Sequence, residues 1–207
     1  MLKEYIKDPK EIERKSFEII TKELGDKTFE ESMGKIVKRV IHTTADFEYA
    51  DLLEFHPKAI ETGKKVLKEG CKIYADTQMI IGGVNKNKLS QFGISIVNFV
   101  HDEDVVKKAL ETGVTRSIIA LEKAALDKDI RVYAIGNAPT ALLTLERLIE
   151  EKKVKPDLII GVPVGFVSAA QSKESIRDTG IPYIISRGRK GGSTVAAAII
   201  NAFLYMI

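Results

Sequence analysis

The spacing of apolar positions before residue 72 is that of amphipathic helices. Asp8 precedes Pro9 and stands three residues before Glu11, so this segment has the features of a helix start with Asp8 as the capping residue. Gly25 predicts the end of this first helix. The segment from Thr28 repeats the start signal, and the stripe after it has the i, i+3, i+4, i+7 spacing of a buried helix face: Met33, Ile36, Val37 and Val40.

From about residue 72 onward, short apolar runs alternate with helical patterns. The runs have the length of strands and are rich in Ile, Val or Tyr: residues 72–75, 94–99, 131–135, 157–162 and 182–186. Helical patterns separate most of them: residues 104–112, 115–126, 139–152, 168–178 and 193–206. This alternation is typical of a parallel sheet covered on both faces. We therefore expect an α/β fold, a three-layer α/β/α domain with a mainly parallel sheet of about five strands.

The chain has 207 residues without a linker or repeat, so we expect a single domain over residues 1–207. The net charge of +3 is small and the cations are spread among acidic residues, which does not suggest nucleic acid. A lone cysteine, Cys71, excludes an internal disulfide and fits a reducing compartment. The N-terminus has no apolar signal segment, and the longest apolar run, residues 195–207, is too short to span a bilayer. We expect a soluble, cytoplasmic protein without a membrane partner, in which this run is a buried helix or a subunit contact.

Four loops follow predicted strands and contain Gly, Pro or polar residues: residues 76–78, 136–140, 161–165 and 187–193. Open parallel sheets bind ligands beyond the carboxyl ends of their strands, where such loops converge. Glycine lets the backbone approach a ligand closely, and free N–H groups at the start of a helix favour anions. Each loop alone is more simply a turn, but four loops on one rim favour a site for an anionic ligand.

Two groups of cations could serve such a site. The loop from Arg187 carries Arg189 and Lys190 beside glycines, but it lacks the phosphate-loop spacing, and no GxGxxG follows an early strand. Its cations could bind carboxylates or form a solvated turn. If Thr115 caps its helix, Arg116 lies at the positive end of the helix dipole. A cation at this position destabilises the helix by about 0.3–1 kcal/mol, and a bound anionic ligand would relieve this repulsion. An ion pair with a nearby Glu is the alternative.

His42 is the candidate acid or base. On a continued helix it faces away from the apolar stripe and lies near Lys38 and Arg39, where a histidine could exchange a proton near neutral pH. The alternative is a histidine that only stabilises a helix C-terminus. The three histidines and Cys71 have no metal-ligand spacing, so we expect no metal site built by the protein. No GxSxG segment or other nucleophile–base arrangement is present.

Five segments of the chain, in order, resemble the precorrin-8X methylmutases, which include the cobalt-precorrin-8 methylmutases. The histidine segment reads Arg39-Val-Ile-His42-Thr-Thr-Ala-Asp46-Phe, and the opening reads Asp8-Pro9-x-x-Ile12-x-x-x-Ser16-Phe17. The other three are residues 136–142, 161–170 and 188–197. The resemblance covers nearly the whole chain. It implies an α/β homodimer that needs no organic cofactor, with any cobalt carried by the substrate.

The reaction that this resemblance implies is an isomerisation in cobalamin biosynthesis. A methyl group moves from ring carbon 11 to carbon 12 of a corrinoid tetrapyrrole in a [1,5]-sigmatropic shift, giving hydrogenobyrinate or cobyrinate. By position, His42 is the proton donor and acceptor, and Ser16 and Arg39 contact the substrate. We expect three further substrate contacts, all on the rim: Arg116, Asn137 and Thr140. Arg189 and exposed loop amides would also suit the carboxylates that fringe the macrocycle.

Two other functions remain open at this point. One is a tetrapyrrole-binding carrier without turnover, which would bind the product and leave the substrate unchanged. The other is an unrelated doubly wound enzyme that acts on a nucleotide or a phosphosugar, although the missing phosphate-loop spacing counts against it. The high Lys, Ile and Glu content favours the cobalt form of the substrate, through its hint of an anaerobic or heat-loving source.

Overall fold

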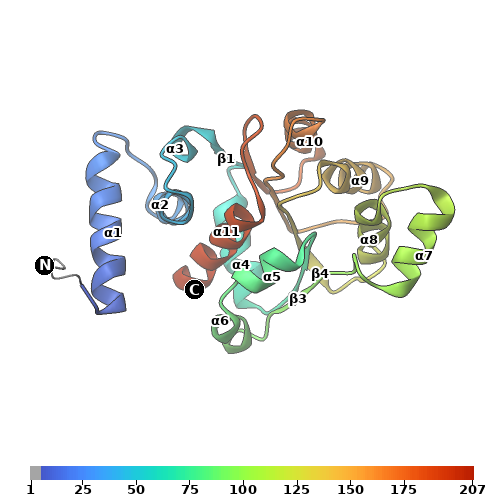
Figure 1. Ribbon diagram of the computed structural model, residues 1–207, viewed down its shortest axis with the longest axis horizontal. Coiled ribbons are helices and arrows are strands. Elements are labelled where there is room, and N and C mark those ends of the chain that lie inside the picture. Colours follow the sequence, from blue (N-terminus) through green and yellow to red (C-terminus); the bar gives the residue numbers. More distant parts are fainter. Residues whose placement is uncertain (1–5) are drawn as a thin grey trace, which may run out of the picture.

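The computed structural model describes residues 6–207, built around one six-stranded sheet with the order β1-β6-β5-β4-β2-β3 (Figure 1). Strands β2 to β6 are parallel to one another, and β1 pairs antiparallel with β6. The strands are β1 (Leu53–Phe55), β2 (Lys72–Ala75), β3 (Ser95–Val97), β4 (Ile130–Ile135), β5 (Leu158–Gly161) and β6 (Tyr183–Ser186). The mainly parallel α/β sheet is confirmed, and each of the five expected runs overlaps one of the strands β2 to β6.

The sequence pattern missed β1, which lies at one edge of the sheet. It has three residues and pairs Leu53 with Ser186 and Phe55 with Ile184. Strand β3 also has three residues, but it lies within the longer predicted run 94–99, whereas β1 is followed at once by His56 and Pro57. Without such a run, three residues are too few to display an alternating pattern. The partner strand β6, rather than the local sequence, therefore determines that this segment is extended.

The helices flank this sheet and are, in chain order, α1 (Pro9–Glu23), α2 (Glu31–Thr44), α3 (Tyr49–Leu52), α4 (Ala59–Lys68), α5 (Gln78–Gly83), α6 (Lys86–Gln91), α7 (Glu103–Thr112), α8 (Arg116–Ala124), α9 (Pro139–Glu150), α10 (Ala169–Ser175), the 3₁₀ turn η1 (Ile176–Thr179) and α11 (Ser193–Met206). Alternating strand residues divide the core between two faces. Ile73 and Val132 belong to a core with α4 and α11. Their neighbours Tyr74 and Tyr133 belong to a core with α8 and α9. The three-layer arrangement is thus confirmed.

The first two helices lie outside α11 on one side of the molecule (Figure 1). α2 packs on α11, and α1 packs on α2. Asp8 caps α1 as predicted, since its Oδ1 accepts the N–H of Glu11 at 2.9 Å. The prediction that α2 starts from Thr28 is wrong.

The residue that caps α2 is Glu30, and the helix itself begins at Glu31. The Glu30 carboxylate accepts the N–H groups of Ser32 and Met33, each at 3.1 Å. A glutamate is long enough to fold back onto these amides, and its negative charge is favourable at the positive end of the helix. These bonds lower the pKa of the Glu30 carboxyl below its ordinary value. A start signal based on Thr, Ser, Asp and Asn alone misses such a cap.

The C-terminal apolar run forms α11, a buried helix, which was one of its two expected roles. Phe203 of α11 lies so close to α4 that a Cβ on Gly63 would come within 2.6 Å of its ring. Asn201, the polar residue within the run, accepts the N–H of Asn85 and donates to the carbonyl of Gly83, both at 2.8 Å. Over residues 6–207, none of the helices combines the length and the apolar character needed to cross a bilayer.

Candidate functional site

The loops after β2, β4, β5 and β6 leave the same edge of the sheet, because these strands are parallel. At this edge a pocket of about 380 Å³ lies between the ends of β2 and β4 and the start of α8. Its lining consists of Asp76, Thr77, Gln78, Val100, His101, Thr115, Arg116, Ser117 and Asn137. Arg116 and Asn137, two of the predicted substrate contacts, therefore share one pocket.

Asp76 organises this pocket from the end of β2. The carboxylate is buried and accepts the backbone N–H groups of Gly136, Asn137 and Ala138 at 2.9, 2.8 and 2.8 Å. Burial raises the pKa of Asp76, and the three N–H bonds oppose that rise. The expectation that these loop amides are free to bind an anion is therefore wrong: an aspartate of the protein already occupies them. A single aspartate directly after a strand was the only sequence signal of this role.

Arg116 is the first residue of α8, as expected, and its side chain is exposed. Thr115 holds the N-cap position, but its hydroxyl makes no capping hydrogen bond. In the described part of the chain Arg116 has no ion pair or hydrogen-bond partner for its side chain, so the alternative of a pairing with a nearby Glu is not realised. A guanidinium at the positive end of a helix, without a carboxylate beside it, is available to an anionic ligand.

His42 lies in a different place, on the outer side of α2. It is exposed in the last turn of α2, and its ring stacks on the ring of Phe17 from α1, with centroids 5.2 Å apart and an angle of 15° between the planes. The expectation that it faces away from the apolar stripe is confirmed. No residue of the described chain hydrogen-bonds to its ring nitrogens. The stack thus orients the imidazole, and both nitrogens lack a partner among the described residues.

Arg39 and Ser16 lie beside the same phenylalanine. Arg39 precedes His42 by three residues, so both side chains lie on one face of α2. The Arg39 guanidinium carbon is 4.7 Å from the ring centroid of Phe17 and 4.9 Å from that of Tyr205, and its Nη1 donates to Glu13 at 2.7 Å. Ser16 precedes Phe17 in α1, and its hydroxyl donates to the carbonyl oxygen of Ile12 at 2.8 Å. Of the three residues carried over by resemblance, His42 and Arg39 therefore contact the ring of Phe17, and Ser16 is its neighbour in the chain.

A smaller pocket of about 220 Å³ adjoins this group, lined by Phe17, Lys35, Lys38, Arg39, Ala202, Tyr205 and Met206. No rim residue lines it, and no residue of α1 or α2 lines the pocket of Arg116 and Asn137. The predicted site residues thus form two groups within one chain: Ser16, Arg39 and His42 on the N-terminal helices, and Arg116 and Asn137 on the rim.

The loop after β6 links these two groups. Lys190 donates to Asp46 at 2.6 Å and lies 3.1 Å from a carboxylate oxygen of Glu48, both in the segment that directly follows α2. The hydrogen bond from Lys190 lowers the pKa of Asp46. Gly191 passes so close to the loop after β5 that a Cβ would lie 2.1 Å from the carbonyl oxygen of Val162. Only glycine permits this crossing.

Of the three cations predicted in this loop, two have partners within the protein. The Arg187 guanidinium donates to the carbonyl oxygen of Asp51, and Lys190 pairs as described above. Arg189 is exposed, and its guanidinium lies over the ring of Phe166 at 5.4 Å from the centroid. It makes no ion pair with any described residue. Arg189 is therefore the one cation of this loop that remains available to a ligand.

Lys173, on α10, is fully buried beneath the loops after β5 and β6. Its ammonium donates to the carbonyl oxygens of Pro163 at 3.1 Å and Lys190 at 2.9 Å, and to the hydroxyl of Ser186 at 3.4 Å. No carboxylate pairs with it in the described structure. Burial lowers the pKa of Lys173 to about 8. Sequence reasoning missed this residue, because nothing in a helix of ordinary composition indicates a buried lysine.

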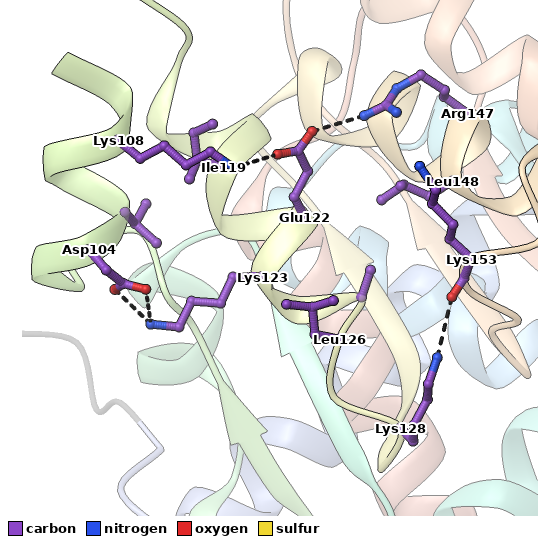
Figure 2. A pocket seen from close by; sticks show the side chains of 12 residues that line it. Asp104, Lys108, Ile119, Glu122, Lys123, Leu126, Lys128, Arg147, Leu148 and Lys153 are labelled. Atoms are coloured by element: carbon purple, nitrogen blue, oxygen red, sulfur yellow. Dashed lines mark hydrogen bonds and ion pairs between the residues drawn. The ribbon is translucent and has the colours of Figure 1, made fainter. Parts of the chain in front are cut away.

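A larger pocket of about 750 Å³ lies between α7, α8 and α9, and Figure 2 shows its lining. The lining consists of Asp104, Val105, Lys108, Ile119, Glu122, Lys123, Ala125, Leu126, Lys128, Arg147, Leu148 and Lys153. None of the predicted site residues is among them. Most of its charged side chains have an ion-pair partner inside or beside the pocket, as in the ion pair of Lys123 with Asp104 at 2.7 Å (Figure 2).

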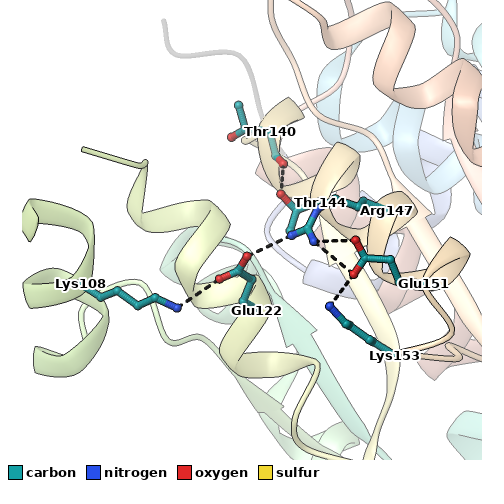
Figure 3. A network of polar contacts seen from close by, with 7 residues as sticks. All are labelled: Lys108, Glu122, Thr140, Thr144, Arg147, Glu151 and Lys153. Atoms are coloured by element: carbon teal, nitrogen blue, oxygen red, sulfur yellow. Dashed lines mark hydrogen bonds and ion pairs between the residues drawn. The ribbon is translucent and has the colours of Figure 1, made fainter. Parts of the chain in front are cut away.

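The same surface carries a chain of ion pairs that runs from α7 to the end of α9 (Figure 3). Glu122 lies between Lys108 at 3.4 Å and Arg147 at 3.0 Å, and Glu151 lies between Arg147 at 3.1 Å and Lys153 at 2.6 Å. Solvent-exposed pairs of this kind stabilise a fold only slightly, and they account for these side chains without a ligand.

Thr140, the last predicted substrate contact, is exposed in the first turn of α9. It does not line the pocket of Arg116 and Asn137. Its carbonyl oxygen accepts the hydroxyl of Thr144 at 2.8 Å (Figure 3). The structure thus places Thr140 near Asn137 in the chain, on the same rim but outside that pocket.

Cys71 is not an activated nucleophile, and the described side chains form no metal-binding cluster. Cys71 is buried, and burial raises the pKa of its thiol to about 12, so it is not a thiolate at neutral pH. Among residues 6–207, no group of three or more His, Cys, Asp or Glu side chains is placed to hold a metal ion.

Comparison with known proteins identifies the family. The family model described as "Precorrin-8X methylmutase" matches residues 11–206. A cobalt-precorrin-8 methylmutase of Leptospira interrogans is 48% identical over 94% of this chain and 92% of its own length. One of Salmonella typhimurium is 43% identical over 97% of each chain, and a precorrin-8X methylmutase of Pseudomonas aeruginosa is 39% identical over 96% of each.

The solved structures agree with these relatives. The structure of a precorrin-8X methylmutase from Thermus thermophilus matches with a TM-score of 0.89 and 36% identity over 95% of both chains. The family model, which matches residues 11–206, spans both groups of site residues: Ser16, Arg39 and His42, and Arg116 and Asn137. The chain therefore belongs to the precorrin-8X methylmutase family.

Proposed function

We propose that this protein is an isomerase of cobalamin biosynthesis that moves a methyl group from ring carbon 11 to ring carbon 12 of cobalt-precorrin-8, which gives cobyrinate. The observation that carries the proposal is the family match over residues 11–206, with relatives named for this reaction at 48% and 43% identity. Four relatives at 42–49% identity are named for the cobalt-containing substrate, which favours the cobalt form. Other relatives with this name are 36% identical, below the Pseudomonas relative, named for precorrin-8X, at 39%.

The chemistry of the two groups of residues supports this assignment. The substrate is a flat macrocycle with acetate and propionate carboxylates at its edge, for which Arg39, Arg116 and Asn137 offer charged and hydrogen-bonding partners. A sigmatropic shift needs no nucleophile. It needs the ring held in a reactive geometry and a proton supplied to the conjugated system, and the ring nitrogens of the exposed His42 suit that role. Ser16, Arg39 and Thr140 complete the proposed set of contacts.

Assembly and location are part of the same proposal. No organic cofactor takes part, and the cobalt belongs to the substrate. We place the protein in the cytoplasm, which suits the free thiol of Cys71. We propose a homodimer, as the family resemblance implies. Apolar side chains exposed on α1 and near the end of α11 support a subunit contact: Ile12 is 45%, Ile19 57% and Tyr205 52% exposed.

The test is anaerobic incubation with cobalt-precorrin-8, followed by absorbance spectroscopy and mass spectrometry. A changed spectrum with unchanged mass is the expected result, since an isomerisation moves a group without adding or removing atoms. Binding without spectral change would point to a carrier of tetrapyrroles. An absence of binding would overturn the assignment, and a thermal shift with nucleotides would then favour the nucleotide or phosphosugar enzyme.

A further inference from the structure

Two adjacent apolar side chains stand almost fully in solvent on the loop after β5. Phe166 and Val167 are each 83% exposed, and Val164 nearby is 46% exposed. Single exposed apolar side chains are common on protein surfaces, but an aromatic and a branched aliphatic side chain together form a patch that marks contact with a ligand or partner. This patch lies at the carboxyl edge of the sheet.

The backbone of this loop is held in place. The N–H of Gly165 donates to the carbonyl oxygen of Arg189 at 3.1 Å, and that of Val164 donates to the carbonyl oxygen of Gly136 at 3.4 Å. Ser168, which ends the loop, has a positive φ of 58°, a conformation that costs a residue with a side chain about 1 kcal/mol or more. The buried ammonium of Lys173 donates to the carbonyl oxygen of Pro163 from below. Exposure of the two side chains is therefore built into the fold.

The charge beside the patch is uncompensated. The Arg189 guanidinium lies 5.4 Å from the ring centroid of Phe166, and no carboxylate of the described chain pairs with it. An apolar surface with a free guanidinium at its margin is complementary to a ligand that has an apolar face and an anionic edge.

The patch also lies next to the segment after β4. Gly165 lies beside Pro139, since a Cβ on Gly165 would be 3.9 Å from the Pro139 ring. Pro139 joins Asn137 to Thr140 in the chain, so the patch adjoins the loop that carries two of the proposed substrate contacts. A macrocycle that reaches Asn137 could extend over the patch.

The geometry points to Phe166, Val167 and Arg189 as a docking platform for the corrinoid, with the apolar side chains against the face of the macrocycle and Arg189 on one of its carboxylates. This inference rests on the proposed function and adds a binding surface to it. The platform contributes binding and no proton transfer, so its loss should raise KM and leave kcat nearly unchanged.

The experiment compares three variants with the wild-type protein. Phe166→Ser is expected to raise KM for cobalt-precorrin-8 about tenfold, and Val167→Ser about threefold, with kcat within about twofold of wild type. Arg189→Gln is expected to weaken the binding of cobyrinate about tenfold in absorbance titrations. The same variant should weaken the binding of a corrin whose side chains are amides by less than about twofold, because that ligand offers no carboxylate. Leu126→Ser is the matched control, since Leu126 is 79% exposed but precedes β4, at the opposite edge of the sheet.

The outcomes separate this inference from the proposed function. Wild-type turnover with unchanged KM in Phe166→Ser and Val167→Ser would overturn the platform and leave the isomerase assignment intact. A lower oligomeric mass of these variants in light scattering would also overturn it, because the patch would then be a contact between copies of the chain. If the wild-type protein itself neither binds nor converts cobalt-precorrin-8, the proposed function fails, and the platform for this ligand fails with it.

Discussion

At the scale of single residues, the chemistry assigned to His42 can be separated from its contribution to the structure. The imidazole is exposed and makes one ring contact, with Phe17, so its removal leaves no buried group without a partner. We expect His42→Ala to lower kcat about 10²–10⁴-fold, the usual contribution of a general acid or base, and to keep cobyrinate affinity within about threefold. Steady-state kinetics and absorbance titration measure the two quantities.

His56→Ala is the control for this prediction. His56 lies at the end of β1, where its Nδ1 accepts the N–H of Lys58, and it is remote from the proposed chemistry. The His56→Ala variant should retain the wild-type kcat. Wild-type kcat in His42→Ala would remove His42 from the mechanism, and an equal loss in both variants would point to a general structural effect.

Lys173 gives a prediction on pH and stability. Burial lowers its pKa in the folded protein to about 8, whereas a lysine in an unfolded chain titrates near pH 10.4, at about its ordinary value. Between these two values the unfolded chain holds more protons at this site than the folded protein, so the free energy of unfolding rises with pH. Below about pH 8 the buried ammonium destabilises the folded protein to its full extent. This destabilisation decreases as the pH rises and is gone above about pH 10.4.

The measurement compares the wild-type protein with Lys173→Met, which cannot titrate. The difference in free energy of unfolding, wild type minus variant, should rise by about 1–2 kcal/mol from pH 7 to pH 9.5 in urea titrations. The subtraction removes other groups that titrate in this range. Parallel pH profiles for the two proteins would show that Lys173 keeps an ordinary pKa.

The residues of the candidate site differ in how well the sequence could predict them. His42 and Arg116 could be singled out as candidates because each stands near a helix end that is visible in the chain, whereas Ser16 and Arg39 could be named only through the family resemblance. Asp76 and Lys173 could not be predicted, because their partners are brought together only by the fold. Asp76 accepts hydrogen bonds from backbone amides that lie 60 to 62 residues further along the chain. A long-range hydrogen bond leaves no periodic signal.

At the scale of elements, Asp76 connects the end of β2 to the loop after β4. Its replacement by Ala would leave three backbone N–H groups without an acceptor at a buried position. We expect Asp76→Ala to lower the free energy of unfolding by about 2–4 kcal/mol, and Asp76→Asn, which keeps one oxygen acceptor, by about half as much. Urea unfolding at neutral pH tests this order. Equal stability of the two variants and the wild type would mean that the loop does not depend on this carboxylate.

The elements that the sequence predicted are those with long patterns. The five parallel strands β2 to β6 and the helices α7 to α9 and α11 have clear runs or periods, and their positions agree with the structure. The short elements α3, α5, α6 and β1 have three to six residues each, too few to show a period, and tertiary contacts determine them. α4 is longer, but a glycine within its ten residues, Gly63, weakens its helical signal.

At the scale of the whole molecule, the proposed contacts lie on two surfaces of one chain. Ser16, Arg39 and His42 lie on the outer helices, and Arg116 and Asn137 lie in the rim pocket. The loop after β6 joins them, because Lys190 pairs with Asp46 directly beyond α2 while Arg189, its neighbour, reaches the proposed platform. Sequence order could not predict this separation, since helix patterns do not show where a helix packs.

The outer face of α1 provides the last prediction, on assembly. Ile12, Ser16 and Ile19 are four and three residues apart and so lie on one helix face, and both isoleucines are largely exposed, at 45% and 57%. A second copy of the chain that covers this face would bury the isoleucines and lie next to Ser16, so assembly and substrate contact would share one surface. We expect Ile19→Glu to convert a dimer to a monomer in light scattering, because the interface would bury an unpaired charge, and to lower kcat/KM about tenfold or more. Leu126→Glu, an equally drastic change at an exposed leucine on another surface, should keep both the mass and the activity. A wild-type protein that is monomeric at micromolar concentration yet fully active would refute the dimer and leave the exposed isoleucines without this role.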